Sequence, residues 1–177
     1  ATGQTSEFPF RPIVLLSLAV FVTVTAEFMP TGLLPQIAEG LAVTEAQVGL
    51  LVTIFAATVV VTAMALSILT RRFSRKSLVI TALLVMALSN IVAALAPSFA
   101  VMVGARILGG LSHGLFFALA NAYAAYLVPR ERLGRAVAIL TAGGTMAFVM
   151  GVPLGTAMGN AFGWRLAFVA LAIIIAV

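Results

Sequence analysis

Long apolar stretches separated by short polar links make up almost the whole chain. Six such stretches, each close to the roughly 20 residues that a helix needs to cross a bilayer, cover residues 11–37, 46–70, 77–96, 99–128, 135–160 and 164–177. We therefore predict an all-helical bundle of six transmembrane helices in one domain. The last stretch would reach only roughly 21 Å into a roughly 30 Å core, so we expect it to be cut short. The chain starts at Ala1 and stops inside an apolar run, so we expect it to be part of a longer polypeptide.

The composition excludes the common soluble classes. The 177 residues are 63% hydrophobic and 8% charged, with a mean hydropathy of +1.21, whereas soluble domains carry about 25% charged residues. A soluble enzyme, a nucleic-acid-binding domain and a disordered tail are thereby excluded. There is no cysteine and only one histidine, so we predict no metal site and no cofactor. The lipid bilayer is the first predicted partner, and nucleic acid is not one.

The basic residues indicate how the chain is oriented. Two links hold most of them: Arg71, Arg72, Arg75 and Lys76 in one, and Arg130, Arg132 and Arg135 in the other. The remaining links are almost free of Lys and Arg. The positive-inside rule therefore predicts that both basic links and the N-terminus are cytoplasmic, and six spans return the C-terminal end to the same side. We expect a multi-pass protein of the plasma membrane, which in a bacterium is the inner membrane.

Glu27 and Arg106 are the formal charges that lie well inside the apolar stretches. Each costs roughly 2.5–3.5 kcal/mol at a helix centre on insertion scales, so a functional role is the first hypothesis. Glu27 lies roughly 22 Å from the cytoplasmic face and Arg106 roughly 10 Å from the outer face, which is the same level within about one turn. We expect them to face each other, directly or through water, across a central cavity. Glu27 would carry a proton and Arg106 would tune it; the alternative is a structural ion pair.

The stretch 99–128 places several polar or unusual side chains on one face. Counted at 100° per residue, they fall within about 80° of one another: Arg106, Gly110, His113, Phe117 and Asn121. This pattern is typical of a cavity lining, and Asn90 in the preceding stretch is a further cavity candidate. The simpler explanation for His113 and for both asparagines is an interhelical hydrogen bond.

Small residues recur at steps of four in the stretch 135–160, namely Gly143, Ala147, Gly151, Gly155 and Gly159. Such a stripe lets another backbone approach closely, either at a sliding interface or in fixed packing inside the bundle. Pro153 should locally break the helical hydrogen bonds. Pro30 and Pro35 interrupt the outer end of the first stretch just after Glu27, which indicates either a binding site at a broken helix or simple termination of the helix.

Several of these segments resemble motifs of the major facilitator superfamily, in its proton-coupled drug and sugar efflux branch. Residues 67–76 (SILTRRFSRK) are similar to the GxLaDRxGRK loop, and Arg72, Arg75 and Lys76 match it. Arg71 stands at the position of the family's Asp, which latches the cytoplasmic gate, so the resemblance does not imply that latch here. Residues 106–117 (RILGGLSHGLFF) resemble the RxxxG motif and the arabinose-type sugar efflux permeases. Residues 151–155 (GVPLG), with Gly151, Pro153 and Gly155, resemble the antiporter motif, and residues 26–35 resemble the first helix of that branch.

The resemblance implies the N-terminal six-helix half of a twelve-helix transporter that works by alternating access. Proton entry would drive efflux of a small organic solute, a sugar or a drug, without any other cofactor. Glu27 and Arg106 would couple the proton, the basic loop would serve the cytoplasmic gate, and a second six-helix half would face the glycine stripe. An importer of the same fold and an oligomeric channel are the alternatives. An enzyme is not expected, because no Ser/His/Asp set is present.

Overall fold

The computed structural model describes residues 8–70 and 72–177, and every regular element in them is helical. In chain order these are α1 (Phe10–Gly32), α2 (Leu34–Leu41), α3 (Glu45–Leu69), α4 (Arg75–Ala94), α5 (Phe99–Leu127), the 3₁₀ turn η1 (Arg130–Arg132), α6 (Leu133–Met146), the π turn η2 (Ala147–Gly151), α7 (Val152–Phe162) and α8 (Trp164–Ala176). Within these residues five helical units are long and apolar enough to cross a membrane, the last being Arg130–Phe162, and α8 is a shorter apolar helix. The predicted all-helical membrane bundle is confirmed.

The first predicted span, 11–37, is not one helix. α1 ends at Gly32, and α2 begins at Leu34 with a proline in its first turn. Pro35 has no N–H for the carbonyl four residues earlier, and its ring crowds that carbonyl, so the chain opens at Leu33. The Leu33 N–H then turns to the Pro30 carbonyl oxygen at 3.1 Å. Pro30 itself lies inside α1, so the helix runs unbroken past Glu27.

Side-chain caps fix where α3 and α4 begin. The Thr44 hydroxyl accepts from the Gln47 N–H at 3.2 Å, and the Gln47 side-chain oxygen accepts from the Thr44 N–H at 2.9 Å. This reciprocal pair is a capping box. Ser74 accepts from the Ser77 N–H at 3.3 Å at the start of α4. Each cap satisfies helix N–H groups that have no partner within the helix.

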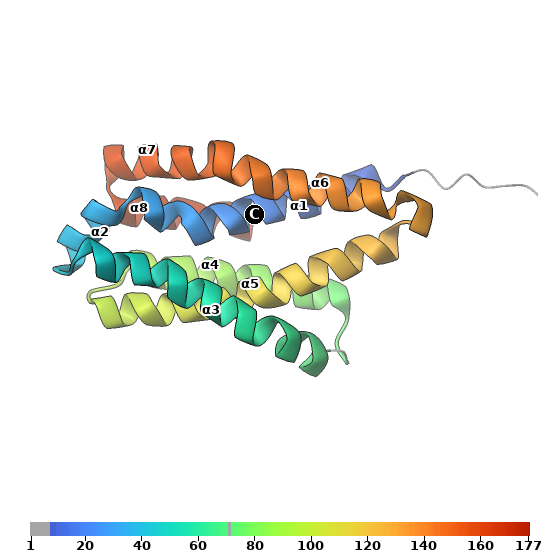
Figure 1. Cartoon of the computed structure of the whole chain (residues 1–177), viewed down its shortest axis with the longest axis horizontal. Coiled ribbons are helices and arrows are strands. Elements are labelled where there is room, and N and C mark those ends of the chain that lie inside the picture. The colour runs from blue at the N-terminus through green and yellow to red at the C-terminus, as the bar shows by residue number, and fades with distance from the viewer. Residues whose placement is uncertain (1–7, 71) are drawn as a thin grey trace, which may run out of the picture.

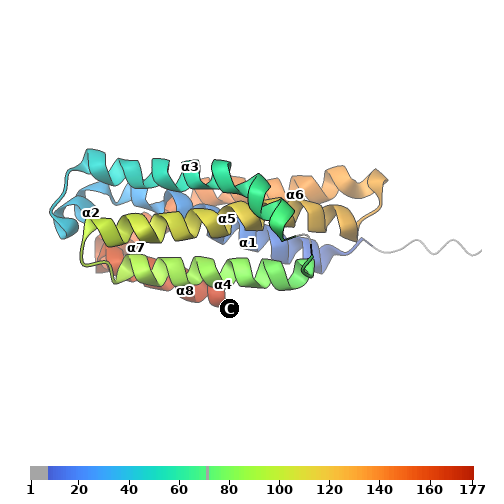
Figure 2. The same cartoon turned by 90° about the horizontal axis from the view of Figure 1, so that it is seen from below.

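The helices form two groups that run along the same long axis (Figure 1). α1 packs against α6, η2 and α7, and α5 packs between α3 and α4, as the turned view shows (Figure 2). α8 joins the groups because it contacts α4, α7 and α1. Buried apolar side chains form one cluster toward the α2 end, around Phe55 and Phe168, and another toward the opposite end, around Phe116 and Leu140.

The small-residue stripe of α6, η2 and α7 packs on α1, inside the same bundle. A Cβ added to Gly143 would overlap the Ser17 carbonyl oxygen, and one added to Gly155 would lie 3.1 Å from Met29. A Cβ on Gly151 would similarly overlap Thr25 of α1, and one on Gly159 would meet Leu33, the residue after α1. The prediction that this stripe faces a second six-helix half is therefore wrong, because α1 already occupies it. Fixed packing, the other explanation, is the one observed.

We predict that Gly143→Ala destabilises the protein by about 1–3 kcal/mol, because the added methyl group must displace the Ser17 backbone. Gly134→Ala is the matched control, since a Cβ on Gly134, in the same helix, meets nothing within 4 Å. Thermal unfolding of the detergent-solubilised protein measures both changes. Equal melting temperatures for the two variants would contradict the close packing of α6 on α1.

Candidate functional site

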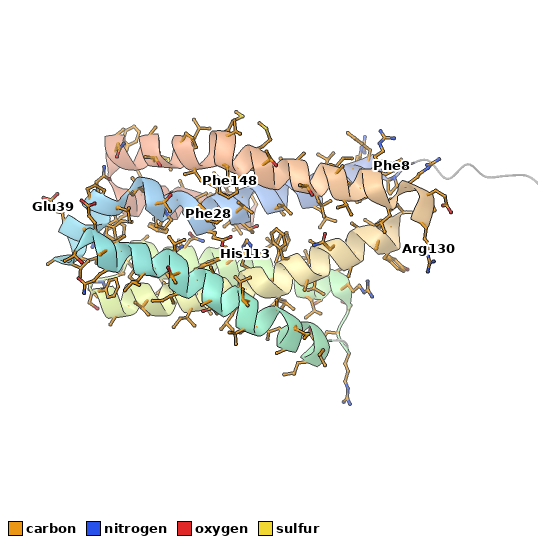
Figure 3. The ribbon with its side chains drawn as sticks, in the orientation of Figure 1. Phe8, Phe28, Glu39, His113, Arg130 and Phe148 are labelled. Carbon is orange, nitrogen blue, oxygen red and sulfur yellow. The ribbon has the colours of Figure 1, made fainter. Side chains whose placement is uncertain are left out.

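A cavity of about 740 Å³ lies between the two helix groups, midway along the bundle. Figure 3 shows His113 between Glu39 at the α2 end and Arg130 at the opposite end. α1, α3, α5, α6 and η2 contribute its walls. The polar side chains that line it are Glu27, His113, Asn121, Thr141 and Thr145, and the aromatic ones are Phe28, Phe117 and Phe148. The rest of the wall is aliphatic or glycine.

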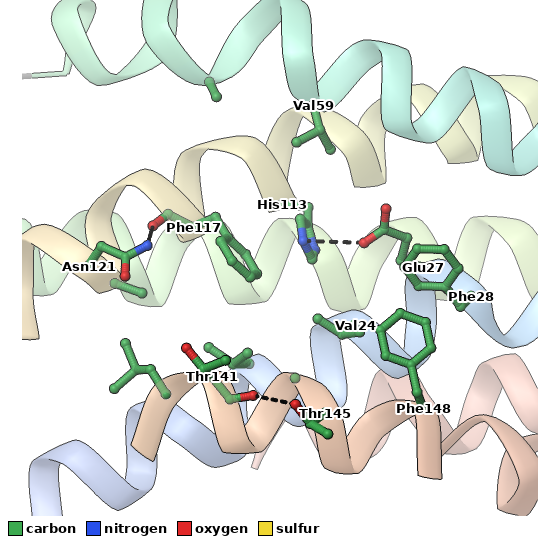
Figure 4. Close-up of a pocket in the computed structure, with 15 residues that line it drawn as sticks. Val24, Glu27, Phe28, Val59, His113, Phe117, Asn121, Thr141, Thr145 and Phe148 are labelled. Carbon is green, nitrogen blue, oxygen red and sulfur yellow. Dashed lines mark hydrogen bonds and ion pairs between the residues drawn. The ribbon is translucent and has the colours of Figure 1, made fainter. Parts of the chain in front are cut away.

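Glu27 and His113 meet across the cavity wall (Figure 4). The Glu27 Oε2 atom lies 3.4 Å from His113 Nε2, and the side chains are 12% and 4% exposed. A carboxyl group and an imidazole at this distance can hold one proton between them, and both groups exchange protons readily. The pair therefore has the geometry that a proton-binding site requires, in the middle of an apolar bundle.

Aromatic rings hold the imidazole of His113 in place. The Phe117 ring stacks on it with centroids 5.0 Å apart, and Phe55 meets it edge-on at 5.5 Å. His113 Nδ1 is buried without a hydrogen-bond partner. Since Nδ1 has no partner, the contact that orients the polar edge of this ring is the one to Glu27. Among the residues that the structure describes, no group of three His, Cys, Asp or Glu side chains could hold a metal ion.

Arg106 is 1% exposed and binds the backbone of α1. Its Nη1 donates to the carbonyl oxygen of Ala26 at 3.1 Å. In a regular helix that carbonyl would accept from residue 30, but Pro30 has no N–H. Arg106 therefore supplies the hydrogen bond that Pro30 leaves missing. The pairing explains how α1 continues through a proline at this depth.

The prediction that Arg106 and Glu27 face each other meets a different arrangement, in which each side chain has another partner. The guanidinium lies 5.0 Å from the centre of the Phe168 ring and 5.6 Å from that of Phe55, which are favourable cation–π distances. Arg106 binds the backbone carbonyl of Ala26, the residue before Glu27. The side chain that contacts Glu27 is that of His113.

The structure brings only part of the predicted cavity set together. Glu27, His113, Phe117 and Asn121 line the cavity, whereas Arg106, Gly110 and Asn90 do not. Gly110 instead admits α3, since a Cβ there would lie 2.8 Å from the Phe55 carbonyl oxygen. Asn90 is buried and donates to the Met86 carbonyl oxygen at 2.9 Å in its own helix. The cavity predictions for Gly110 and Asn90 are therefore wrong, because both lie where neighbouring helices touch.

The other predicted residues lie away from the cavity. Arg75 donates to the Ala122 carbonyl oxygen of α5 at 3.0 Å, and Arg72 and Lys76 are exposed at the same end. Arg71 lies outside the described residues. Gly151 and Gly155 pack on α1, as described above. Pro153 lies in the first turn of α7, directly after the π turn, so the predicted break in the helical hydrogen bonds at this proline is observed.

Four polar or aromatic residues of the cavity wall are not among the predicted ones: Phe28, Thr141, Thr145 and Phe148. A usable signal was present. Thr141, Thr145 and Phe148 follow one another at steps of four and three, which marks one helix face. That face lies beside the small-residue stripe, and the stripe was the more prominent pattern.

Comparison with known proteins identifies relatives of the chain. The sequence model described as Major Facilitator Superfamily matches residues 16–177. The inner membrane transport protein YdhP of Escherichia coli K12 is 37% identical over 161 residues, which is 91% of this chain and 41% of that protein. A chloramphenicol resistance protein of Streptomyces lividans is 40% identical over 162 residues (92% and 41%). A probable sugar efflux transporter of Pasteurella multocida is 34% identical over 165 residues (93% and 41%).

A solved structure has the same fold. The chain matches a bacterial homolog of the human lysosomal transporter Spinster, crystallised in an inward-facing, unoccupied conformation, with a TM-score of 0.78 and 20% identity. The match covers 97% of this chain and 42% of that one. The chain thus spans about two fifths of the length of the proteins that it matches, and its helices correspond to the N-terminal half of their fold.

We predict that Arg106→Met destabilises the protein by about 1–3 kcal/mol, because the buried Ala26 carbonyl loses its donor. Pro30→Ala restores a backbone N–H four residues after Ala26 and should relieve the loss. The double variant should therefore unfold at a higher temperature than Arg106→Met alone. Thermal unfolding of the four proteins forms a double-mutant cycle, and strictly additive effects would show that the two residues do not share this carbonyl.

Proposed function

Because this chain belongs to the Major Facilitator Superfamily, we propose that it forms the N-terminal half of a transporter that exports a small organic solute in exchange for protons. The observation that carries the proposal is the Glu27–His113 pair in the wall of an otherwise apolar cavity. The names of relatives point in the same direction, since one is a chloramphenicol resistance protein and another a probable sugar efflux transporter.

The pair offers a simple route from proton binding to solute release. Glu27 belongs both to the proton-binding pair and to the cavity wall. A proton on the pair satisfies the carboxylate, whereas the unprotonated carboxylate is an acceptor for a hydroxyl, amide or ammonium group of the solute. Proton and solute therefore compete for Glu27, and linkage requires that each weakens the binding of the other. Such mutual exclusion at one site is sufficient for antiport when access alternates between the two sides of the membrane.

The charge at the two ends of the bundle supports an orientation. Arg72, Arg75 and Lys76 lie in the link before α4 and at its start, and Arg130 and Arg132 lie in η1, all at the end remote from α2 (Figures 1 and 3). The positive-inside rule then makes this end cytoplasmic and the α2 end external. The proposed location is the plasma membrane of a bacterium, as the E. coli relative is an inner membrane protein. A second six-helix half would close the cavity from its open side.

We predict that Glu27→Gln abolishes uptake driven by a pH gradient. The amide keeps the size of the side chain but cannot take up a proton, so solute binding no longer responds to protons. Proteoliposomes that contain the whole protein and are acidic inside measure this directly, with radiolabelled chloramphenicol and L-arabinose as probes. Wild-type protein should accumulate at least one probe, and Glu27→Gln should fall to the level of protein-free vesicles.

Glu39→Gln is the matched control, since Glu39 is exposed in α2 and remote from the cavity. This variant should accumulate the probe like wild type. Exchange of labelled for unlabelled probe without a gradient should persist in Glu27→Gln, which shows that the variant is folded. Gradient-driven accumulation that survives Glu27→Gln would refute the proton role. Gradient-driven loss of probe from these vesicles would identify an importer, and flux that does not saturate would identify a channel.

A further inference from the structure

Two aromatic ends enclose the polar centre of the cavity (Figure 4). At one end the rings of Phe28 in α1 and Phe148 in η2 are 4.8 Å apart and tilted by 52°. At the other end Phe117 stacks on His113. The Glu27 carboxylate lies between these ends. A molecule that fills the cavity must therefore contact rings at either side of a carboxylate.

Phe148 lies in the π turn η2, directly after a buried residue of the small-residue stripe. Small residues recur every four positions from Gly143 to Gly159, but an α-helix turns once every 3.6 residues, so the stripe would drift by about 40° at each step. In η2 the Val152 N–H bonds to the Ala147 carbonyl oxygen, five residues back. This wider turn takes up part of the drift, and Ala147 and Gly151 are both buried. Phe148 is the next residue after Ala147, and its ring lies beside that of Phe28 in the cavity wall.

The polar side chains of the cavity mostly present acceptors. The Thr145 hydroxyl donates to the Thr141 carbonyl oxygen at 3.1 Å, and the Asn121 amide donates to the Phe117 carbonyl oxygen at 3.1 Å. The Thr145 hydroxyl oxygen, the Asn121 side-chain oxygen and the Glu27 carboxylate remain as acceptors. A matching solute carries hydrogen-bond donors.

The aliphatic wall disfavours a sugar. Val20, Val24, Val59 and Leu140 line the cavity and offer nothing to a hydroxyl group. A sugar has a hydroxyl on almost every carbon, and each one buried without a partner weakens binding. An aromatic ring instead gains contact with the wall and with the phenylalanine rings.

We propose that Phe148 forms with Phe28 the ring-binding end of the site, and that the solute is an aromatic molecule whose hydrogen-bond donors reach Glu27. This inference rests on the proposed function and assigns its substrate class. Phe148 is then a specificity-determining residue, and Glu27 accepts hydrogen bonds from the polar part of the same molecule.

Equilibrium binding to the whole purified protein tests the proposal, with chloramphenicol and L-arabinose as probes. Chloramphenicol is an uncharged nitrobenzene that carries hydroxyl groups and an amide N–H, and arabinose has no ring of this kind. Chloramphenicol should bind more tightly than arabinose. Phe148→Leu keeps an apolar side chain but removes the ring, and should weaken chloramphenicol binding by about 3- to 10-fold and arabinose binding less.

Phe162→Leu is the matched control, because Phe162 is 71% exposed at the end of α7 and does not line the cavity. It should bind both probes like wild type. Phe28→Leu removes the partner ring and gives an independent measurement if Phe148→Leu does not fold. Arabinose binding as tight as chloramphenicol binding, no chloramphenicol binding, or an unchanged affinity in the ring variants would each overturn the inference.

The two proposals fail in different ways. Proton-driven transport of arabinose that needs Glu27 but not Phe148 would overturn the substrate class and leave the proposed function intact. Chloramphenicol binding that depends on the phenylalanine rings, in a protein whose transport does not depend on the pH gradient, would overturn the proposed function and leave the substrate class intact.

Discussion

Pro30 leaves the carbonyl of Ala26 without its helical donor in the middle of an apolar bundle, and the guanidinium of Arg106 supplies the missing hydrogen bond. Neither feature is stable alone. A buried carbonyl without a donor and a buried charge without polar partners are both costly. Together they join α5 to α1 at one backbone position, and Phe55 and Phe168 complete the surroundings of the guanidinium from α3 and α8. Four helices thus meet at a single side chain.

Another face of α1 packs at close range against the small residues of α6, η2 and α7. Gly143, Gly151 and Gly155 bring α6, η2 and α7 against it, with no space for a methyl group at Gly143 and little at Gly155. The π turn directly before Pro153 widens the helix along this contact and takes up part of the drift of the four-residue repeat. Phe148 lies in the same turn and lines the cavity. The close packing of α6 and η2 on α1 therefore positions one wall of the cavity.

Much of the fold could be predicted from the sequence, because apolar runs of bilayer length leave few alternatives in a membrane. The same holds for Glu27 and His113, since polar side chains at this depth are unusual enough to be singled out. The partner of Arg106 could not be predicted, because it is a backbone carbonyl freed by a proline, and charge alone suggested Glu27. Gly110 and the glycine stripe were misassigned for a related reason: small residues predict close approach, but the approaching helix is decided by tertiary packing. Phe148 was missed because the small-residue stripe on the neighbouring face of the same stretch was the more prominent pattern, although Thr141, Thr145 and Phe148 share one helix face.

The packing around Glu27 also bears on how a proton could be exchanged in the proposed cycle. Glu27 directly follows Ala26 in α1. The hydrogen bond from Arg106 to the Ala26 carbonyl therefore holds the backbone next to Glu27, whose carboxylate contacts His113. Both members of the pair lie in one packed bundle, in which α1 is joined to α5 by Arg106 and to α6 and α7 by the small residues. Rocking of this bundle against a second half would leave the pair together. Such a motion changes the access of water and solute to the cavity. In the proposed cycle the proton would therefore be loaded and released by this change of access, and Glu27 and His113 would stay in contact.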